Sequence, residues 1–205
     1  MESLALAFSS GWASGVNAYL VVLVLGIAER IDASAQIPDE LGSWQVLGVA
    51  ALMYAFEFVA DKVPYVDSAW DVISTLIRPF VGGAIGVLLA GDSTEITALV
   101  GGSVGGVTAF ASHAVKAGTR LAVNTSPEPA SNISMSIAED VVVLALVWFA
   151  IEHPYIAAGI AGVLLVIGLG VLYFAIRLIR RGWRRFWAWR ERRRARRRPQ
   201  QYEVQ

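Results

Sequence analysis

Apolar residues follow one another along most of the chain, in runs long enough to cross the hydrocarbon core of a bilayer, which takes about 20 helical residues. We predict six such helices, over residues 4–27, 41–60, 70–90, 96–115, 136–151 and 155–176. Charges interrupt the second, third and fifth runs, so these three are the candidates for re-entrant or partly unwound segments. The pattern predicts an all-α integral membrane protein with about six transmembrane helices.

Composition supports this prediction and adds an asymmetry of charge. The chain is 56% hydrophobic with a mean hydropathy of +0.55, well above what a soluble domain of this size needs. Its formal charge is zero, yet 12 of its 17 basic residues fall between Arg177 and Arg198, so the preceding part is acidic. Because the chain has no cysteine, disulfides, thiolate ligands and thiol catalysis are excluded.

Basic residues in the short connections predict the orientation. Lys62, Lys116 and Arg120, together with the Arg-rich C-terminal stretch, fall on one side of the membrane if all six helices cross it. The positive-inside rule places that side in the cytoplasm, so both termini are predicted to be cytoplasmic. The N-terminal segment lacks a basic region before its apolar run, so we interpret it as the first spanning helix and not as a cleavable signal peptide.

Two short matches indicate an internal repeat. "GWASGVNAY" at 11–19 aligns with "GSVGGVTAF" at 102–110, and "ADKVPYV" at 60–66 resembles "AIEHPYI" at 150–156 at nearly the same offset. Three spans in each copy would make them inverted-topology repeats. We therefore predict a first three-helix repeat over 1–92, a second over 93–176 and a basic tail over 177–205. The alternative is chance similarity between two apolar helices.

Glycines spaced by four residues occur in both copies of the match. Such spacing lets helix backbones approach closely, which predicts helix packing through Gly11, Gly15, Gly102 and Gly106. Asn17 and Thr108 occupy equivalent positions in the first and fourth helices. We expect these two helices to form a central pair, with Asn17 and Thr108 on the ligand pathway; simple packing is the alternative.

Ionisable residues gather near the predicted cytoplasmic ends of three helices. Glu57 and Asp61 share one helix face, and His113, Lys116 and Arg120 form a stripe that we interpret as cationic. The predicted ligand or ion pathway comprises Asn17, Glu57, Asp61, Lys62, Asp67, Thr108, His113, Lys116, Arg120, Glu128, Glu139 and Asp140. Charges at membrane depth mark a pathway or a relay unless they only lock the fold as ion pairs.

Some of these polar residues have a simpler interpretation. Ser68 with Asp71, and Ser136 with Glu139, fit the Ser-x-x-Asp/Glu signature of a helix N-terminus. The loop "NTSPEPASN" at 124–132 carries Glu128 between two prolines, and it is either a gate over the charged cluster or an ordinary rigid turn.

The C-terminal stretch alternates arginines with Trp183, Phe186, Trp187 and Trp189. Aromatic rings favour the headgroup zone and arginines favour anionic lipid, so we predict a basic amphipathic tail that binds anionic headgroups. Nucleic-acid binding is the weaker alternative, because the adjacent spanning helix explains the composition. Further expected partners are the lipid bilayer and a second copy in a homo-oligomer.

Three strings of the sequence carry a resemblance to a known family. These are "EFVADKVPYVDSAWD", then "SHAVKAGTRLAVNTSPEPASNISMSIAEDVVV", then the basic C-terminus. Over essentially its whole length the chain resembles the small integral membrane proteins grouped as domain of unknown function 4126. The resemblance implies a polytopic protein of the bacterial inner membrane and supplies no substrate.

Two classes of function follow from these patterns. The first is a transporter or channel for a small solute or an ion, with a charged site on the cytoplasmic side. The second is a structural or assembly membrane protein in which buried ion pairs only stabilise the fold. An enzyme is less favoured, because no nucleophile motif is present; an aspartate pair that holds magnesium against a lipid phosphate stays open. No cofactor is predicted, and no metal is assigned.

Overall fold

The computed structural model describes residues 1–63, 65–91, 94–123 and 129–196, and every regular element in these ranges is helical. The prediction of an all-α fold is confirmed. The elements in chain order are α1 (Glu2–Arg30), the 3-10 helix η1 (Asp39–Gly42), α2 (Trp44–Ala60), α3 (Val66–Leu88), α4 (Glu95–Val123), α5 (Pro129–Glu152) and α6 (Pro154–Arg196). Five of them, α1 and α3 to α6, are long and apolar enough to cross a membrane, while α2 is shorter.

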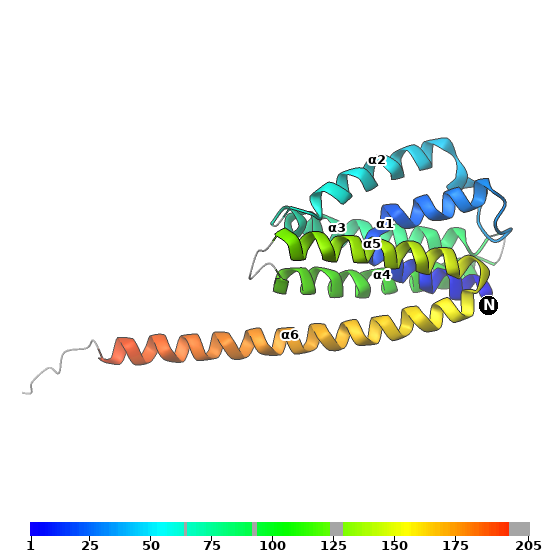
Figure 1. Ribbon diagram of the computed structural model, residues 1–205. Helices are drawn as coiled ribbons and strands as arrows, with labels where there is room; N and C mark the ends of the chain where they lie inside the picture. The colour runs from blue at the N-terminus through cyan, green and yellow to red at the C-terminus, as the bar shows by residue number, and fades with distance from the viewer. Residues whose placement is uncertain (64, 92–93, 124–128, 197–205) are drawn as a thin grey trace, which may run out of the picture.

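Helix α1 does not run straight through the bundle. Asn17 has extended backbone angles, φ −150° and ψ 97°, which divide α1 into two half-helices. The second half turns back toward the N-terminus. As a result Glu2, the first residue of α1, accepts a hydrogen bond of 2.9 Å from Gln36, which follows the end of α1. Figure 1 shows the N-terminus at the same end of the bundle as the connection between α1 and α2. Helix α1 is therefore an element that turns back within the bundle, a reversal that we did not predict for this segment.

The remaining helices alternate in direction across the bundle. We call the end that holds Glu2 the amino end, and the end beyond which α6 continues the tail end (Figure 1). Helix α2 runs to the tail end, α3 returns, and α4, α5 and α6 follow in turn. The start of α1 and the described end of α6 thus lie at opposite ends of the bundle. The prediction of both termini on one side of a membrane counted α1 as a complete crossing, and the break at Asn17 does not support that count.

The inverted repeat is not confirmed. Gly11 of α1 lies against Gly105 of α4, Gly15 lies against Ala109, and Lys116 reaches the Val16 carbonyl. Residue numbers increase together along both helices, so these segments run in the same direction. Segments related by an inverted repeat would run in opposite directions.

Helix α4 lies between the first half of α1 and helix α3. A Cβ atom on Gly11 or Gly15 would overlap α4, and one on Gly101 or Gly105 would overlap the carbonyl oxygens of α3. Of the glycines singled out in the sequence, Gly102 and Gly106 face α3, next to Gly83. These backbones approach closely because no side chain separates them.

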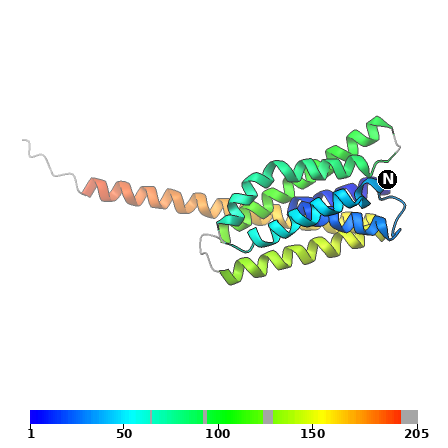
Figure 2. The same ribbon diagram turned by 90° about the horizontal axis from the view of Figure 1, so that it is seen from above.

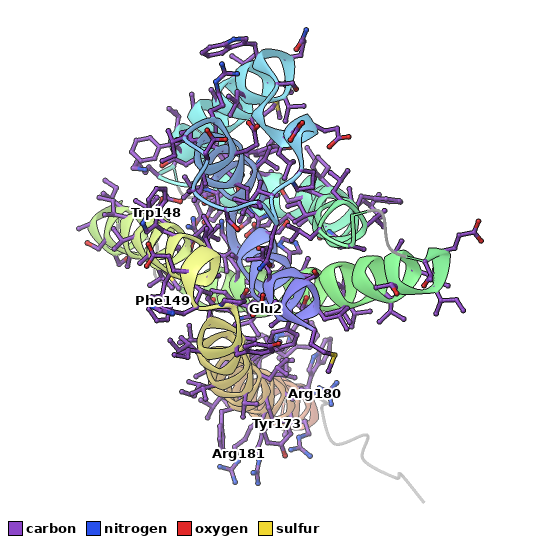
Figure 3. All side chains as sticks on the ribbon, turned by 90° about the vertical axis from the view of Figure 1, so that its right-hand side faces the viewer. Glu2, Trp148, Phe149, Tyr173, Arg180 and Arg181 are labelled. Carbon is purple, nitrogen blue, oxygen red and sulfur yellow. The ribbon has the colours of Figure 1, made fainter. Side chains whose placement is uncertain are left out.

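Many charged side chains are buried and many large apolar side chains are exposed, unlike the usual distribution in a soluble protein. The interior around α1 holds buried arginines, lysine and carboxylates, while the outer surface exposes Val, Leu, Ile, Phe and Trp from every α-helix except α1, which exposes only Ile27. Figure 3, viewed from the amino end, shows Trp148 and Phe149 of α5 on the outside of the bundle. Helix α6 covers one side of the bundle and then continues well past it (Figure 2). Tyr173, Arg180 and Arg181 of that helix point away from the other helices (Figure 3).

Candidate functional site

The site is built around the break in α1. The side-chain oxygen of Asn17 accepts a hydrogen bond of 3.0 Å from the Leu20 backbone N–H, which caps the second half-helix. Its amide nitrogen donates to Asp140 of α5 at 2.9 Å. Asn17 therefore serves both halves of the break: it ends one helix, starts the next, and ties the turn to α5.

The carbonyl groups freed at the end of the first half-helix are satisfied by α3 and α4. Lys116 Nζ donates to the Val16 oxygen at 2.9 Å, an Arg78 nitrogen donates to the Gly15 oxygen at 3.0 Å, and Ser112 donates to the Trp12 oxygen at 2.7 Å. The C-terminal end of a helix carries partial negative charge, so the two cations are placed where they stabilise it.

A second layer of ion pairs lies toward the tail end. Asp61 accepts from Lys116 Nζ at 2.7 Å and lies 3.2 Å from an Arg120 nitrogen. Arg120 also pairs with Glu139 at 2.6 Å and with Asp67 at 3.6 Å. Each cation thus contacts carboxylates from at least two different elements, which fixes α2, α4 and α5 relative to one another.

Arg78 of α3 forms the centre of another group. Its guanidinium pairs with Glu57, lies 3.5 Å from Asp71, and donates to Nδ1 of His113 at 2.7 Å. Because arginine is only a donor, Nδ1 of His113 must be the acceptor. Nε2 then carries the proton and donates to the Asp71 carbonyl at 3.1 Å. His113 is therefore neutral, and the prediction that it belongs to a cationic stripe is wrong.

We call these interacting side chains the charged network: Asn17, Glu57, Asp61, Asp67, Asp71, Arg78, His113, Lys116, Arg120, Glu139 and Asp140. Most of them are at most 4% exposed; Glu139 and Asp140 are intermediate. Carboxylates outnumber cations. Among the described residues, Glu57 Oε2, Asp61 Oδ1 and both Asp71 side-chain oxygens accept no hydrogen bond. Buried oxygens without donors are costly, so the network has capacity for a further donor or cation.

Two ionisable groups at the tail end show how burial and charge compete. Burial would raise the pKa of Asp61, but the nearby charges of Lys116 and Arg120 outweigh it, so the pKa lies below its ordinary value. Burial lowers the pKa of Lys62, and Asp140 and Asp61 only partly offset this effect. Lys62 lies at the edge of the network, where it donates to Ser136 at 3.4 Å and to the Phe58 carbonyl at 2.9 Å.

The structure brings together most of the residues proposed from the sequence. Thr108 is an exception, because its hydroxyl donates to carbonyls of its own helix at Val104 and Gly105. Glu128 and most of the proposed gate loop lie outside the described residues. At the end of that loop, Asn132 lies 3.4 Å from Asp67.

Sequence reasoning missed two members of the charged network, Arg78 and Asp71. Arg78 is the only ionisable residue between residues 72 and 90, and a charge isolated in an apolar run was the available signal. Asp71 was assigned to a helix cap together with Ser68. Helix α3 starts earlier, at Val66, so this cap is absent, and Asp71 faces Arg78. The Ser136 cap is likewise wrong, because α5 starts at Pro129.

A cavity of about 320 Å³ adjoins the network between α1, α4, α5 and α6. Val16, Lys116 and Glu139 line it, so it reaches the break in α1. Among the described residues, no group of three or more His, Asp or Glu side chains is arranged to hold a metal ion.

Apolar helices on the outside and paired charges inside are the distribution expected of a helical membrane protein. Residues 4–174 match the model of one protein family, described as domain of unknown function (DUF4126), and the chain belongs to that family. This confirms the resemblance found in the sequence. No curated protein and no solved structure matches the chain.

Proposed function

We propose that this protein is a membrane carrier for a small charged solute or an ion, with its site at the break in α1. The observation that carries the proposal is the interruption of α1 at Asn17, with each broken end held by the charged network. Each half-helix is about 20 Å long at 1.5 Å per residue, so neither crosses a hydrocarbon core of about 30 Å. Helices broken at membrane depth are the substrate and ion sites of many carriers.

The electrostatics of the break support the same proposal. A positive half-helix end faces Asp140, and a negative end faces Lys116 and Arg78. A charged ligand that enters here competes with groups already in place, so its binding changes the pairing of α1 with α4 and α5. That coupling between ligand binding and helix position is what alternating access requires.

We further propose that the tail end faces the cytoplasm. Lys62, Lys116, Arg120 and the arginines of α6 from Arg177 to Arg196 all lie toward that end. The positive-inside rule then places the N-terminus on the opposite side. The basic, aromatic part of α6 would contact anionic headgroups beside the bundle.

A structural or assembly protein is the second candidate. It is favoured by the pairing of every cation in the network with at least one carboxylate, an arrangement that also serves as a lock between helices. The two candidates differ in what happens when a pair is removed as a unit.

The test uses the double variant Asp61→Asn with Lys116→Met, reconstituted in liposomes beside the wild type. Currents and internal pH are recorded while a panel of inorganic cations, amines and organic anions is applied. We expect a solute-dependent signal for the wild type and its loss in a double variant that is folded and more stable than either single variant. A double variant that is stable and transports as well as the wild type would remove the network from transport and favour the structural role.

A further inference from the structure

The cavity beside the network continues as a groove along the outside of the bundle. A second cavity, of about 450 Å³, lies between α5 and α6 and shares Val142 and Leu164 with the first. We call the two together the lateral groove. Its walls are almost entirely apolar, whereas its floor contains the charged residues Lys116 and Glu139. A groove of this composition matches an amphiphile and not a fully polar solute.

Glu139 is the polar group of the floor that has capacity for a ligand. One of its oxygens pairs with Arg120 at 2.6 Å and with Lys116 at 3.5 Å. Within the described part of the chain, its other oxygen accepts no hydrogen bond, and 16% of the side chain is exposed. A carboxylate oxygen that faces an apolar groove at membrane depth is costly without a donor.

The ammonium and hydroxyl groups that line the floor are already engaged. Lys116 is held by Val16 and Asp61, while Ser112 and Thr119 donate to carbonyls of α1 and α4. The ammonium and hydroxyl donors of the floor are therefore already used within the bundle, whereas Glu139 keeps an acceptor for a ligand. Because carboxylates outnumber cations in the network, a donor with a positive charge fits best. The contact between Glu139 and the Lys116 ammonium shows that this carboxylate already accommodates one primary ammonium group.

We propose that the lateral groove binds an amphiphilic primary amine. Its ammonium group donates to the second oxygen of Glu139, and its apolar chain lies between α5 and α6 along Val142 and Leu164. This site deepens the proposed function, because it names the class of ligand and lets the ligand enter from the side of the bundle. Transport of the ligand rests on the proposed carrier function. The shared chemistry is found in an ethanolamine lipid headgroup and in a free alkylamine.

The test uses the full chain in nanodiscs of phosphatidylcholine, which has no primary amine. Binding of n-octylammonium is followed by thermal unfolding and by the change in tryptophan fluorescence, to which Trp12 in the groove contributes. n-Octyltrimethylammonium has the same chain and charge but cannot donate an N–H bond. We expect it to bind about tenfold more weakly, a difference of about 1.4 kcal/mol. Equal affinities would overturn the proposal.

Two variants locate the site. Glu139→Gln removes the charge of the proposed ligand contact. Ala138→Phe fills the groove and changes no residue of an ion pair, so it tests the site even if Glu139→Gln fails to fold. We expect Glu139→Gln to lose the preference for n-octylammonium, and Ala138→Phe to bind it more weakly. Val163→Phe, on an exposed part of α6 outside the groove, is the control and should bind like the wild type. Undiminished binding by Ala138→Phe would overturn the proposal.

Nanodiscs that contain phosphatidylethanolamine separate the two sources. If the lipid headgroup is the ligand, it competes, and the apparent affinity for n-octylammonium falls; if the affinity is unchanged, the ligand is a free amine. Transport is measured separately in liposomes. Failure of binding with solute flux intact would overturn only the amine site, while binding without any flux would overturn only the carrier function.

Discussion

Lys116 Nζ donates to the Val16 carbonyl of α1 at 2.9 Å and to the Asp61 carboxylate beyond α2 at 2.7 Å. One ammonium thus closes the broken helix and neutralises a buried acid. Removing either charged partner leaves the other uncompensated. We expect Lys116→Met and Asp61→Asn each to lower the free energy of unfolding by roughly 3–5 kcal/mol, and the double variant to recover much of that loss.

This cycle is measured by thermal or denaturant unfolding in detergent. Lys62→Met is the matched control, because Lys62 is adjacent to Asp61, yet among the described residues its ammonium contacts Ser136 and the carbonyl and ring of Phe58 and forms no ion pair. We expect it to cost at most about 1 kcal/mol. Strictly additive effects of Lys116→Met and Asp61→Asn would show that the two groups do not stabilise the fold as a pair.

The low pKa of Asp61 predicts a dependence on pH. Its folded-state pKa lies below the ordinary value of 3.8, so its ionised form contributes stability above that value and loses it as the pH falls through the folded-state pKa. The penalty of Asp61→Asn should therefore be large at neutral pH and shrink below about pH 4. Unfolding curves of both proteins over this range provide the measurement. A penalty that stays constant in acid would contradict the ion pair as its cause.

Close approach of α1 and α4 makes Gly15 sensitive to any added side chain. A Cβ atom there would overlap the Ala109 carbonyl and the Ser112 hydroxyl, so Gly15→Ala should destabilise the protein by about 1–3 kcal/mol. Gly106→Ala should cost less, because the nearest atom, the Pro79 oxygen, would lie at 3.2 Å.

Gly159→Ala in α6 is the control for this glycine series. No atom lies within 4 Å of the added Cβ, so the change should be neutral or stabilise the helix by about 0.5–1 kcal/mol. Melting temperatures in one detergent compare the three variants. Equal effects at Gly15 and Gly159 would show that the α1–α4 contact does not limit stability.

Much of the site was predictable from the sequence, because charges are rare in apolar helices and must find one another. Glu57, Asp61, Lys116 and Arg120 are far apart in the chain, yet low-dielectric surroundings leave them few alternatives to pairing. The helices themselves followed from the lengths of the apolar runs.

The reversal of α1 was not predictable from hydropathy. Residues 4–27 form an apolar run of the length that a simple span would have, and the asparagine within it is an ordinary residue for a packed helix. Asn17 becomes a helix cap only because Asp140, Arg78 and Lys116, from three other helices, satisfy the groups that the break exposes. The reversal therefore depends on tertiary contacts. It also changes the number of times that the chain passes from one end of the bundle to the other.

Asn17 and Asp140 should show charge-dependent coupling. Asn17→Asp keeps the oxygen that caps the second half-helix but replaces the donor to Asp140 with a second carboxylate. We expect it to be more destabilising than Asn17→Ala, which should cost about 1–2 kcal/mol for the lost cap. Asp140→Asn should rescue Asn17→Asp, as measured by thermal unfolding. If Asn17→Asp is as stable as the wild type, the Asn17–Asp140 contact is not required.

The last prediction concerns the path of the chain through the membrane, and the absence of native cysteines makes it directly testable. Ser3 and Ser34 lie at the amino end of the bundle, because Glu2 contacts Gln36, whereas Gly182 belongs to the C-terminal part of α6, the helix that continues past the tail end. With the tail end in the cytoplasm, Ser3→Cys and Ser34→Cys should react with an impermeant thiol reagent applied from outside intact cells. Gly182→Cys should react only after the membrane is opened, and labelling in detergent shows that all three thiols are reactive. If Ser3→Cys is protected while Ser34→Cys is labelled, α1 crosses the membrane as one helix, and the break at Asn17 is a kink within a complete span.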